Sequence, residues 1–215
     1  MSRARRDVDA HPFSLRLVYP LVRALVLVLF RRFGARYRRE GVEQVPRTGG
    51  LLIFPNHLSN CDPLATQLAS PRLIHFMARR EIFDMPQYGW MLRWFRAFPV
   101  TQSSADLGAI KNAIALAKAG HAVCIYPEGQ LSPDGELLPL FPGIAMVARK
   151  AGVPCICLGI RGTEDIMPSP MQAPRYQKTM IRCVWGEPRQ FASDASQEEV
   201  MTWVESELRR LSARK

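Results

Sequence analysis

Cysteine is scarce in this chain of 215 residues, and its cysteines are not spaced for a metal or redox site. The five are Cys61, Cys124, Cys155, Cys157 and Cys183. No two of them form a Cys-x-x-Cys pair, and five scattered thiols are too few for a disulfide-stabilised secreted scaffold. Free thiols persist in reducing compartments, so we expect the chain to face the cytoplasm.

Several common catalytic and nucleotide-binding motifs are also absent. The chain contains no G-x-S-x-G, no P-loop and no G-x-G-x-x-G, so it gives no sign of a nucleophile elbow or of a glycine-rich phosphate loop. His11, His75 and His121 stand alone, without Cys or carboxylate partners at metal-ligand spacing. The sequence therefore predicts neither a metal nor a cofactor.

The apolar run near the start of the chain is short. It covers Leu17–Phe30 and contains one charge, Arg23. Fourteen residues of helix span about 21 Å, less than a hydrocarbon core of about 30 Å, so we do not expect a simple transmembrane helix. Basic residues follow the run where a signal peptide would have a small-residue cleavage site, which argues against a secretory leader.

Acidic residues are rare in the first forty positions, which carry ten arginines and three acids and hence +7 of the net charge of +10. The arginines that follow the apolar run are Arg31, Arg32, Arg36, Arg38 and Arg39. This pattern is typical of a segment in the interface of an anionic membrane leaflet. The alternative is an apolar helix packed on the domain with solvated arginines. Nucleic acid is not expected as a partner, because aromatic residues do not interleave the basic cluster.

We accordingly divide the chain into a basic, apolar, membrane-associating segment, 1–40, and a domain, 41–215. Apolar residues make up 47% of the chain and charged residues 22%, as in globular proteins. Strands are expected at Gly50–Pro55, Leu73–Ala78, Val123–Tyr126 and Val153–Ile160, with Met180–Trp185 at an edge. Helices are expected at Asp62–Ala69, after the capping box Ser103-x-x-Asp106, at Gly143–Lys150, and after the capping box Ser196-x-x-Glu199. This alternation predicts an α/β fold with a mainly parallel central sheet flanked by helices, plus the N-terminal interface helix.

The segment Asn56-His57-Leu58-Ser59-Asn60-Cys61-Asp62 lies between a predicted strand and a predicted helix, where α/β proteins place their sites. On a continuous helix His57 and Asp62 would be about 140° apart, but a loop can bring them together. Asp62 could then orient the imidazole and stabilise its cation, while the other ring nitrogen takes a proton from a hydroxyl. Alternatively, Asp62 only caps the helix. Cys61 is more typical of a packed small residue than of a nucleophile.

A second segment, Tyr126-Pro127-Glu128-Gly129-Gln130-Leu131-Ser132, also leaves the end of a predicted strand. In a parallel sheet it would lie at the same carboxyl-end edge as His57. Gly129 permits a ligand to approach the backbone closely, and Glu128 could anchor a hydroxyl or an arginine. The alternative is a polar turn, which Ser132-Pro133-Asp134-Gly135 indicates.

Together the two segments resemble the glycerolipid acyltransferases typified by 1-acyl-glycerol-3-phosphate acyltransferases, a lysophospholipid acyltransferase family that carries N-H-x-x-x-x-D and F-P-E-G-T-R. Further stretches match that family in order: Ala78–Phe83, Pro86, Gly89-Trp90, Gly135–Pro139, Gly143 and Ala151–Pro154. The resemblance covers roughly residues 38–190.

The resemblance implies transfer of a fatty acyl group from acyl-CoA or acyl carrier protein to the free hydroxyl of a lyso-glycerolipid. His57 would be the general base and Asp62 its orienter, and the thioester would be a co-substrate rather than a cofactor. Candidate substrate-binding residues are Asn56, Glu128, Gly129, Gln130, Arg79, Arg80 and Arg161. We expect membrane lipids as partners, and a peripheral or monotopic location on the cytoplasmic face of the cell membrane.

The chain departs from the family pattern at two arginine positions. Gln130-Leu131 stands where the family has Thr-Arg, and Gln102 replaces a second arginine. Those arginines are associated with the acceptor's phosphate, and neither Gln nor Leu replaces a guanidinium fork. Either other arginines bind the phosphate, or the acceptor is an aminolipid, a glycolipid or another lyso-lipid without a phosphomonoester. A non-catalytic lipid-binding module is a further alternative, against which the intact His57 and Asp62 argue.

Overall fold

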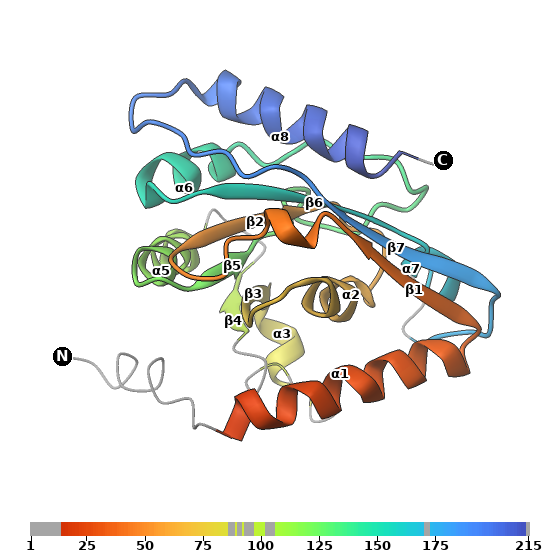
Figure 1. Cartoon of the computed structure of the whole chain (residues 1–215). Coiled ribbons are helices and arrows are strands. Elements are labelled where there is room, and N and C mark those ends of the chain that lie inside the picture. The colour runs from red at the N-terminus through yellow and green to blue at the C-terminus, as the bar shows by residue number, and fades with distance from the viewer. Residues whose placement is uncertain are drawn as a thin grey trace.

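A central sheet with helices on both faces forms the body of the molecule (Figure 1). The computed structural model describes residues 14–85, 89, 92, 97–101, 106–169 and 173–213. In these ranges the strands are β1 (Ala35–Glu40), β2 (Leu51–Pro55), β3 (Ile74–Arg79), β4 (Phe98–Val100), β5 (Ala122–Cys124), β6 (Cys155–Arg161) and β7 (Thr179–Trp185). Their order across the sheet is β1-β7-β6-β2-β5-β3-β4.

The sheet is mainly parallel, as predicted. Among the described strands, every neighbouring pair is parallel except β6 with β7. The prediction that residues 180–185 form an edge strand is wrong, because β1 pairs with the outer side of β7. Neither β1 nor β4 was predicted from the sequence. The polar, arginine-rich residues of β1 are mostly half-buried or exposed, and β4 is only three residues long.

The described helices are α1 (Ser14–Arg32), α2 (Asp62–Ala69), α3 (Arg80–Phe83), α5 (Leu107–Lys118), α6 (Gly143–Ala151), α7 (Thr163–Ile166) and α8 (Gln197–Leu211), with a 3₁₀ turn, η2 (Val42–Gln44). Ser196 caps α8 as predicted, since its hydroxyl accepts a hydrogen bond from the Glu199 N–H. The N-cap of α5 is Asp106, whose carboxylate accepts from the Ala109 N–H. The predicted capping residue Ser103 lies outside the described residues.

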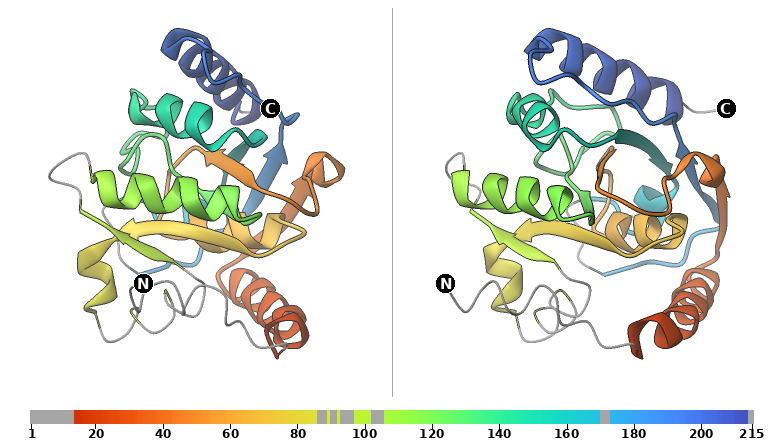
Figure 2. Two further views of the ribbon diagram at one scale, coloured as in Figure 1. Left: turned by 90° about the vertical axis from the view of Figure 1, so that its left-hand side faces the viewer. Right: turned by 60° about the vertical axis from the view of Figure 1, so that its left-hand side comes forward.

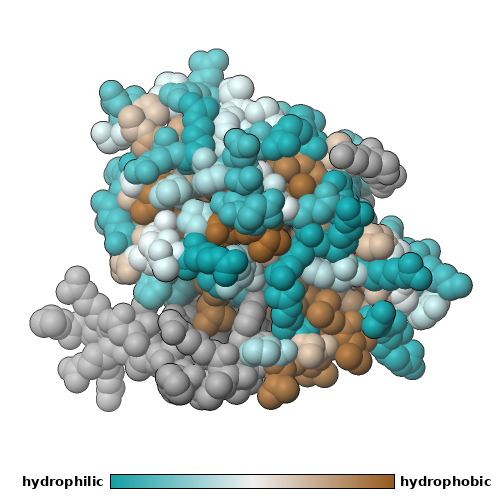
Figure 3. Space-filling view, viewed as in Figure 1, coloured by the Kyte–Doolittle hydropathy of each residue, from teal (hydrophilic) through white to brown (hydrophobic). Residues whose placement is uncertain are grey.

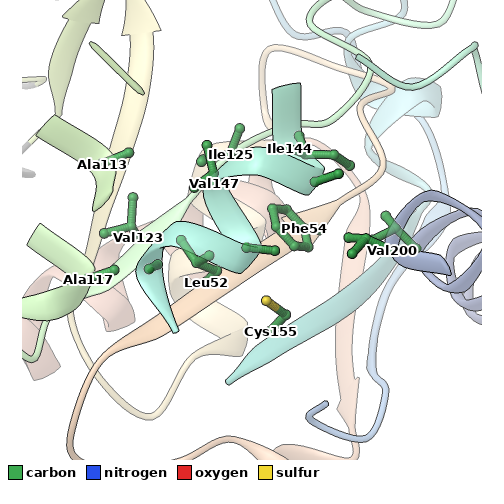
Figure 4. Packing of buried hydrophobic residues seen from close by; sticks show 14 of the residues in the cluster. Leu52, Phe54, Ala113, Ala117, Val123, Ile125, Ile144, Val147, Cys155 and Val200 are labelled. Carbon is green, nitrogen blue, oxygen red and sulfur yellow. The ribbon is translucent and has the colours of Figure 1, made fainter. Parts of the chain in front are cut away.

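Alternating strand side chains build two apolar layers, because successive residues of a strand point to opposite faces. One layer lies beneath α5, α6 and α8, and Figure 4 shows strand residues of β2, β5 and β6 packed there against these helices. Its labelled members include Leu52, Phe54, Val123, Cys155, Ala113, Val147 and Val200. The other layer contains Leu51, Ile53 and Ile156, with residues of α1, α2 and α7. Figure 1 shows α8 and α6 above the sheet and α1 and α2 below it, and Figure 2 shows the same layers from two other sides.

The N-terminal segment is joined to this body. Val26 and Phe30 of α1 are buried in the second layer, and residues 35–40 form β1, a strand of the central sheet. The predicted boundary at residue 40 thus falls at the end of a sheet strand. In the described part of the chain, no helix combines the length and apolarity needed to cross a membrane.

The carboxyl ends of β6, β2 and β5 lie side by side, since these three strands are neighbours and parallel. Asn56, the first residue after β2, ties two of these ends together. Its buried amide nitrogen donates to the Ile160 carbonyl at 3.0 Å, and its oxygen accepts from the Ile160 N–H at 2.7 Å. The loops that follow the three strands therefore start from a fixed edge.

Replacing Asn56 tests this link. Asn56→Ala should lower the free energy of unfolding by about 2–4 kcal/mol, because it leaves a buried N–H and a buried carbonyl without their partner. Urea denaturation measures the change. Gln190→Ala is the matched control, since the exposed Gln190 amide also donates to a backbone carbonyl, that of Gly152, and should change stability by less than about 0.5 kcal/mol. Equal stability of Asn56→Ala and the wild type would contradict the link.

Candidate active site

The structure brings His57 and Asp62 into contact at the carboxyl end of β2. The imidazole Nδ1 lies 2.8 Å from Asp62 Oδ2. The Asp62 side chain is fully buried, whereas the His57 side chain keeps 17% of its surface exposed. The pair therefore joins a buried anion to a ring that a substrate can reach.

The Asp62 carboxylate turns back toward the loop instead of capping α2. Oδ2 also accepts hydrogen bonds from the Leu58 and Ser59 N–H groups, at 2.6 and 2.8 Å. Oδ1 accepts from the Thr163 hydroxyl at 2.5 Å. These donors replace the water that a buried carboxylate loses, so both oxygens keep a fixed orientation.

The contact with Asp62 also determines the tautomer of His57. A carboxylate only accepts hydrogen bonds, so Nδ1 carries the proton in this pair. In the neutral imidazole, Nε2 then has the free lone pair. A hydroxyl could give its proton to a ring nitrogen in this state, and a carboxylate at the other nitrogen could stabilise the resulting cation.

Tyr126 covers one face of the His57 ring. The two ring centroids are 3.9 Å apart and the ring planes differ by 22°. The Tyr126 hydroxyl lies 3.3 Å from the Thr66 hydroxyl, and burial raises the pKa of this phenol well above its ordinary value. Tyr126 is therefore a neutral ring that stacks on the imidazole and restricts its orientation.

Glu128 binds backbone N–H groups of two loops, the loop after β2 that contains His57 and the loop after β5 that contains Leu138. Its Oε1 accepts from the His57 N–H at 2.7 Å, and its Oε2 accepts from the Leu138 N–H at 2.9 Å. A further bond runs from the Ser132 N–H to the His57 carbonyl, at 2.8 Å. Burial raises the pKa of the Glu128 carboxyl above its ordinary value, although the two N–H groups oppose that rise. The carboxylate predicted to anchor a substrate hydroxyl or an arginine is here occupied by backbone donors.

The other candidate residues lie at three places. Gly129 and Gln130 are exposed in the loop after β5, and a Cβ on Gly129 would meet nothing within 4 Å. Arg79 and Arg80 are exposed where β3 ends and α3 begins, at the same sheet edge as His57. Arg161 instead donates to the carbonyls of Ser212 and Gly135, both at 2.6 Å.

Tyr126, which contacts His57, and Thr163, which contacts Asp62, have no role that the sequence alone predicts. Each comes just after a strand whose end adjoins β2, but strand order cannot be read from the chain. Gln102 lies outside the described residues. Asn56, as shown above, uses its amide to join β2 to β6.

Other chemistry at this edge has little support from the described residues. Cys61 is buried beside Asp62, and burial raises the pKa of its thiol to about 11, so it is not a thiolate nucleophile at neutral pH. Among the residues that the structure describes, no three His, Cys, Asp or Glu side chains gather as metal ligands.

Known proteins resemble this chain in both sequence and structure. It is 27% identical over 187 residues to a 1-acyl-sn-glycerol-3-phosphate acyltransferase of Bacillus subtilis, covering 85% of this chain and 89% of that protein. A chloroplastic enzyme of the same description from Brassica napus is 30% identical over 133 residues, which are 60% of this chain and 38% of the plant protein. The chain thus spans less than two fifths of that relative, and the same holds for the similar Arabidopsis thaliana protein, at 37%.

The fold is also shared with a solved structure. The crystal structure of a 1-acyl-sn-glycerophosphate acyltransferase from Thermotoga maritima superposes with a TM-score of 0.70 and 25% identity, covering 98% of this chain and 88% of that one. The model of the Acyltransferase family matches residues 36–161, more than half of the chain, and this range contains His57, Asp62 and Glu128. The chain therefore belongs to the acyltransferase family.

Proposed function

We propose that this chain transfers a fatty acyl group from a thioester to the free hydroxyl of 1-acyl-glycerol-3-phosphate. The observation that carries the proposal is the contact between His57 Nδ1 and the buried Asp62 carboxylate, which prepares Nε2 as a base. The relatives named above, described as 1-acyl-sn-glycerol-3-phosphate acyltransferases, support the choice of acceptor. Acyl-CoA and acyl carrier protein both suit the reaction as thioester donors.

In the proposed reaction, His57 Nε2 takes the proton of the acceptor hydroxyl as its oxygen attacks the thioester carbonyl. Asp62 stabilises the imidazolium that forms. The carbon–sulfur bond then breaks, and the thiolate leaves with the proton that His57 returns, giving an ester and a free thiol. Because the thioester is already activated, the step needs no covalent acyl-enzyme, and the base contributes about 10²–10⁴ in rate.

The base is tested by replacing its ring. His57→Ala should lower kcat for acyl transfer by about 10²–10⁴ or more with the fold intact. Asp62→Asn should also lose much of the rate, because a neutral amide stabilises imidazolium poorly. His121→Ala is the matched control: His121 precedes β5, and its carbonyl accepts from the Leu51 N–H at the opposite end of the sheet. Near-normal turnover by folded His57→Ala would refute the assignment.

The acceptor's phosphate needs cationic donors that are not already engaged. Arg161 is occupied by two carbonyls, and Leu131 provides no charge where the family has arginine. Arg79 and Arg80 are exposed at the edge that carries His57. We therefore propose that Arg79 and Arg80 bind the phosphate. The engaged Arg161 and the uncharged Leu131 favour a second candidate function, the same transfer to a lyso-lipid without a phosphomonoester.

Kinetics with matched acceptors separate these candidates. If the phosphate is bound as proposed, Arg79→Ala and Arg80→Ala should each raise KM for lysophosphatidic acid by about 10–100-fold, the equivalent of one charge-assisted hydrogen bond. Arg47→Ala, an exposed arginine before β2, should leave KM unchanged. A higher kcat/KM for lyso-lipids with capped or phosphate-free head groups would instead establish the second candidate.

We further propose that α1 lies in the interface of an anionic membrane on the cytoplasmic side. Its exposed face carries Leu21, Leu25 and Val28, with 70%, 67% and 63% of their surface accessible, while Val26 and Phe30 pack inward. Figure 3 shows apolar residues gathered along the lower edge of the molecule, where α1 lies. The exposed Arg31 and Arg32 follow at the helix end, suited to lipid phosphates.

Charge placed on this face should abolish membrane binding. Leu21→Glu/Leu25→Glu should no longer sediment with vesicles containing anionic lipid, since each glutamate opposes both apolar burial and the surface potential. Activity should fall more on bilayer-embedded than on detergent-dispersed acceptor. Leu107→Glu is the matched control, since Leu107 is also an exposed leucine but lies on α5, on the other side of the sheet. Unbound wild-type protein at about 0.15 M salt, where screening is moderate, would contradict the proposal.

A further inference from the structure

Thr163 is a fully buried polar residue that directly contacts the proposed catalytic pair. It is the first residue of α7, and its hydroxyl donates to Asp62 Oδ1 at 2.5 Å across 101 residues of sequence. The other carboxylate oxygen, Oδ2, receives His57 Nδ1 and the backbone N–H groups of Leu58 and Ser59. The two oxygens of Asp62 are thus held from different elements, Oδ2 from the loop after β2 and Oδ1 from the segment after β6.

The segment that carries Thr163 is itself fixed. Gly162 has φ of +89°, and a Cβ there would lie 2.3 Å from the Met180 carbonyl oxygen, so the sharp turn from β6 into α7 requires glycine. The Glu164 carboxylate accepts from the Gly162 N–H at 2.7 Å. A second link joins α7 to the site loop, because the Ser59 hydroxyl donates to the Met167 carbonyl at 2.8 Å.

We propose that Thr163 is a positioning residue for acyl transfer, whose hydroxyl keeps the Asp62 carboxylate aimed at His57. The inference rests on the proposed function. A carboxylate can rotate about its bond to Cβ, and a buried oxygen without a donor favours any rotation that finds one. With Oδ1 held by Thr163, Oδ2 stays in the plane that meets Nδ1. Thr163 acts through Asp62 and does not touch the acyl donor or the acceptor.

The variant that removes only the hydroxyl is Thr163→Val, which keeps the shape of the side chain. It should lower kcat by about 10–100-fold, because one hydrogen bond to a charged group is lost, and it should leave KM for both substrates unchanged. Thr163→Ser restores a hydroxyl at the same atom and should stay within about threefold of the wild type. Circular dichroism and thermal unfolding confirm that the assays use folded protein. If Thr163→Val does not fold, Thr163→Ala lacks the same hydroxyl and places no methyl group against the Asp62 carboxylate.

A double-mutant cycle distinguishes positioning from a general effect on structure. In an Asp62→Asn background, Thr163→Val should change the residual rate by less than about twofold, since the carboxylate through which it acts is gone. Losses that multiply in the double variant would overturn the inference, and so would wild-type kcat in folded Thr163→Val. Failure of the proposed function has another signature: full activity in His57→Ala. Loss of activity in His57→Ala together with an unaffected Thr163→Val would refute only the role of Thr163.

Discussion

The buried carboxylate of Asp62 is the constraint on which the site depends. A fully buried carboxylate has to receive hydrogen bonds on both oxygens, because each unmet acceptor costs about 1–3 kcal/mol or more. No single segment provides these donors here: one oxygen is met by the loop after β2 and the other by Thr163 after β6. The loop and the start of α7 must therefore converge, which the parallel pairing of β2 with β6 achieves.

A second buried carboxylate extends this arrangement to the next strand. Glu128 follows β5 and accepts the N–H of His57, while Tyr126 of the same loop stacks on the His57 ring. The backbone N–H of His57 is thus bound by Glu128 after β5. Its ring is contacted by Asp62 and by Tyr126. Such restraint suits the general base proposed here, because proton transfer depends on orientation fixed before the substrate arrives. Three neighbouring strands contribute to the orientation of one imidazole.

Sequence patterns predict the parts of this arrangement that are locally encoded. Continuous apolar runs revealed β2, β5 and β6, and the loop between a strand and a helix made contact between His57 and Asp62 possible. The remaining parts depend on partners distant in sequence. The amide of Asn56 and the guanidinium of Arg161 donate to backbone carbonyls that are 26 to 104 residues away in the sequence. Nothing in the local sequence indicates these partners. Thr163 could not be identified either, since its role requires knowing that β6 adjoins β2. The strand β1 was not predicted, because its arginines obscure the alternation of apolar and polar residues that is typical of a half-buried strand.

The helix α1 packs against the body of the molecule, so a membrane contact through α1 would also orient that body. Val26 and Phe30 pack into the layer beneath the sheet, and Phe33 N–H bonds to the last turn of α1 as the chain enters β1. The helix is therefore fixed to the sheet at its carboxyl end and is not a flexible tether. A helix held in this way, with Leu21, Leu25 and Val28 outward, would present the α/β body to a lipid surface in one orientation. Such an orientation would also place the carboxyl-end edge, with His57, at a set direction from the bilayer. The exposed side of α1 would then bind the membrane, and its buried side would fix the direction of the site relative to the bilayer.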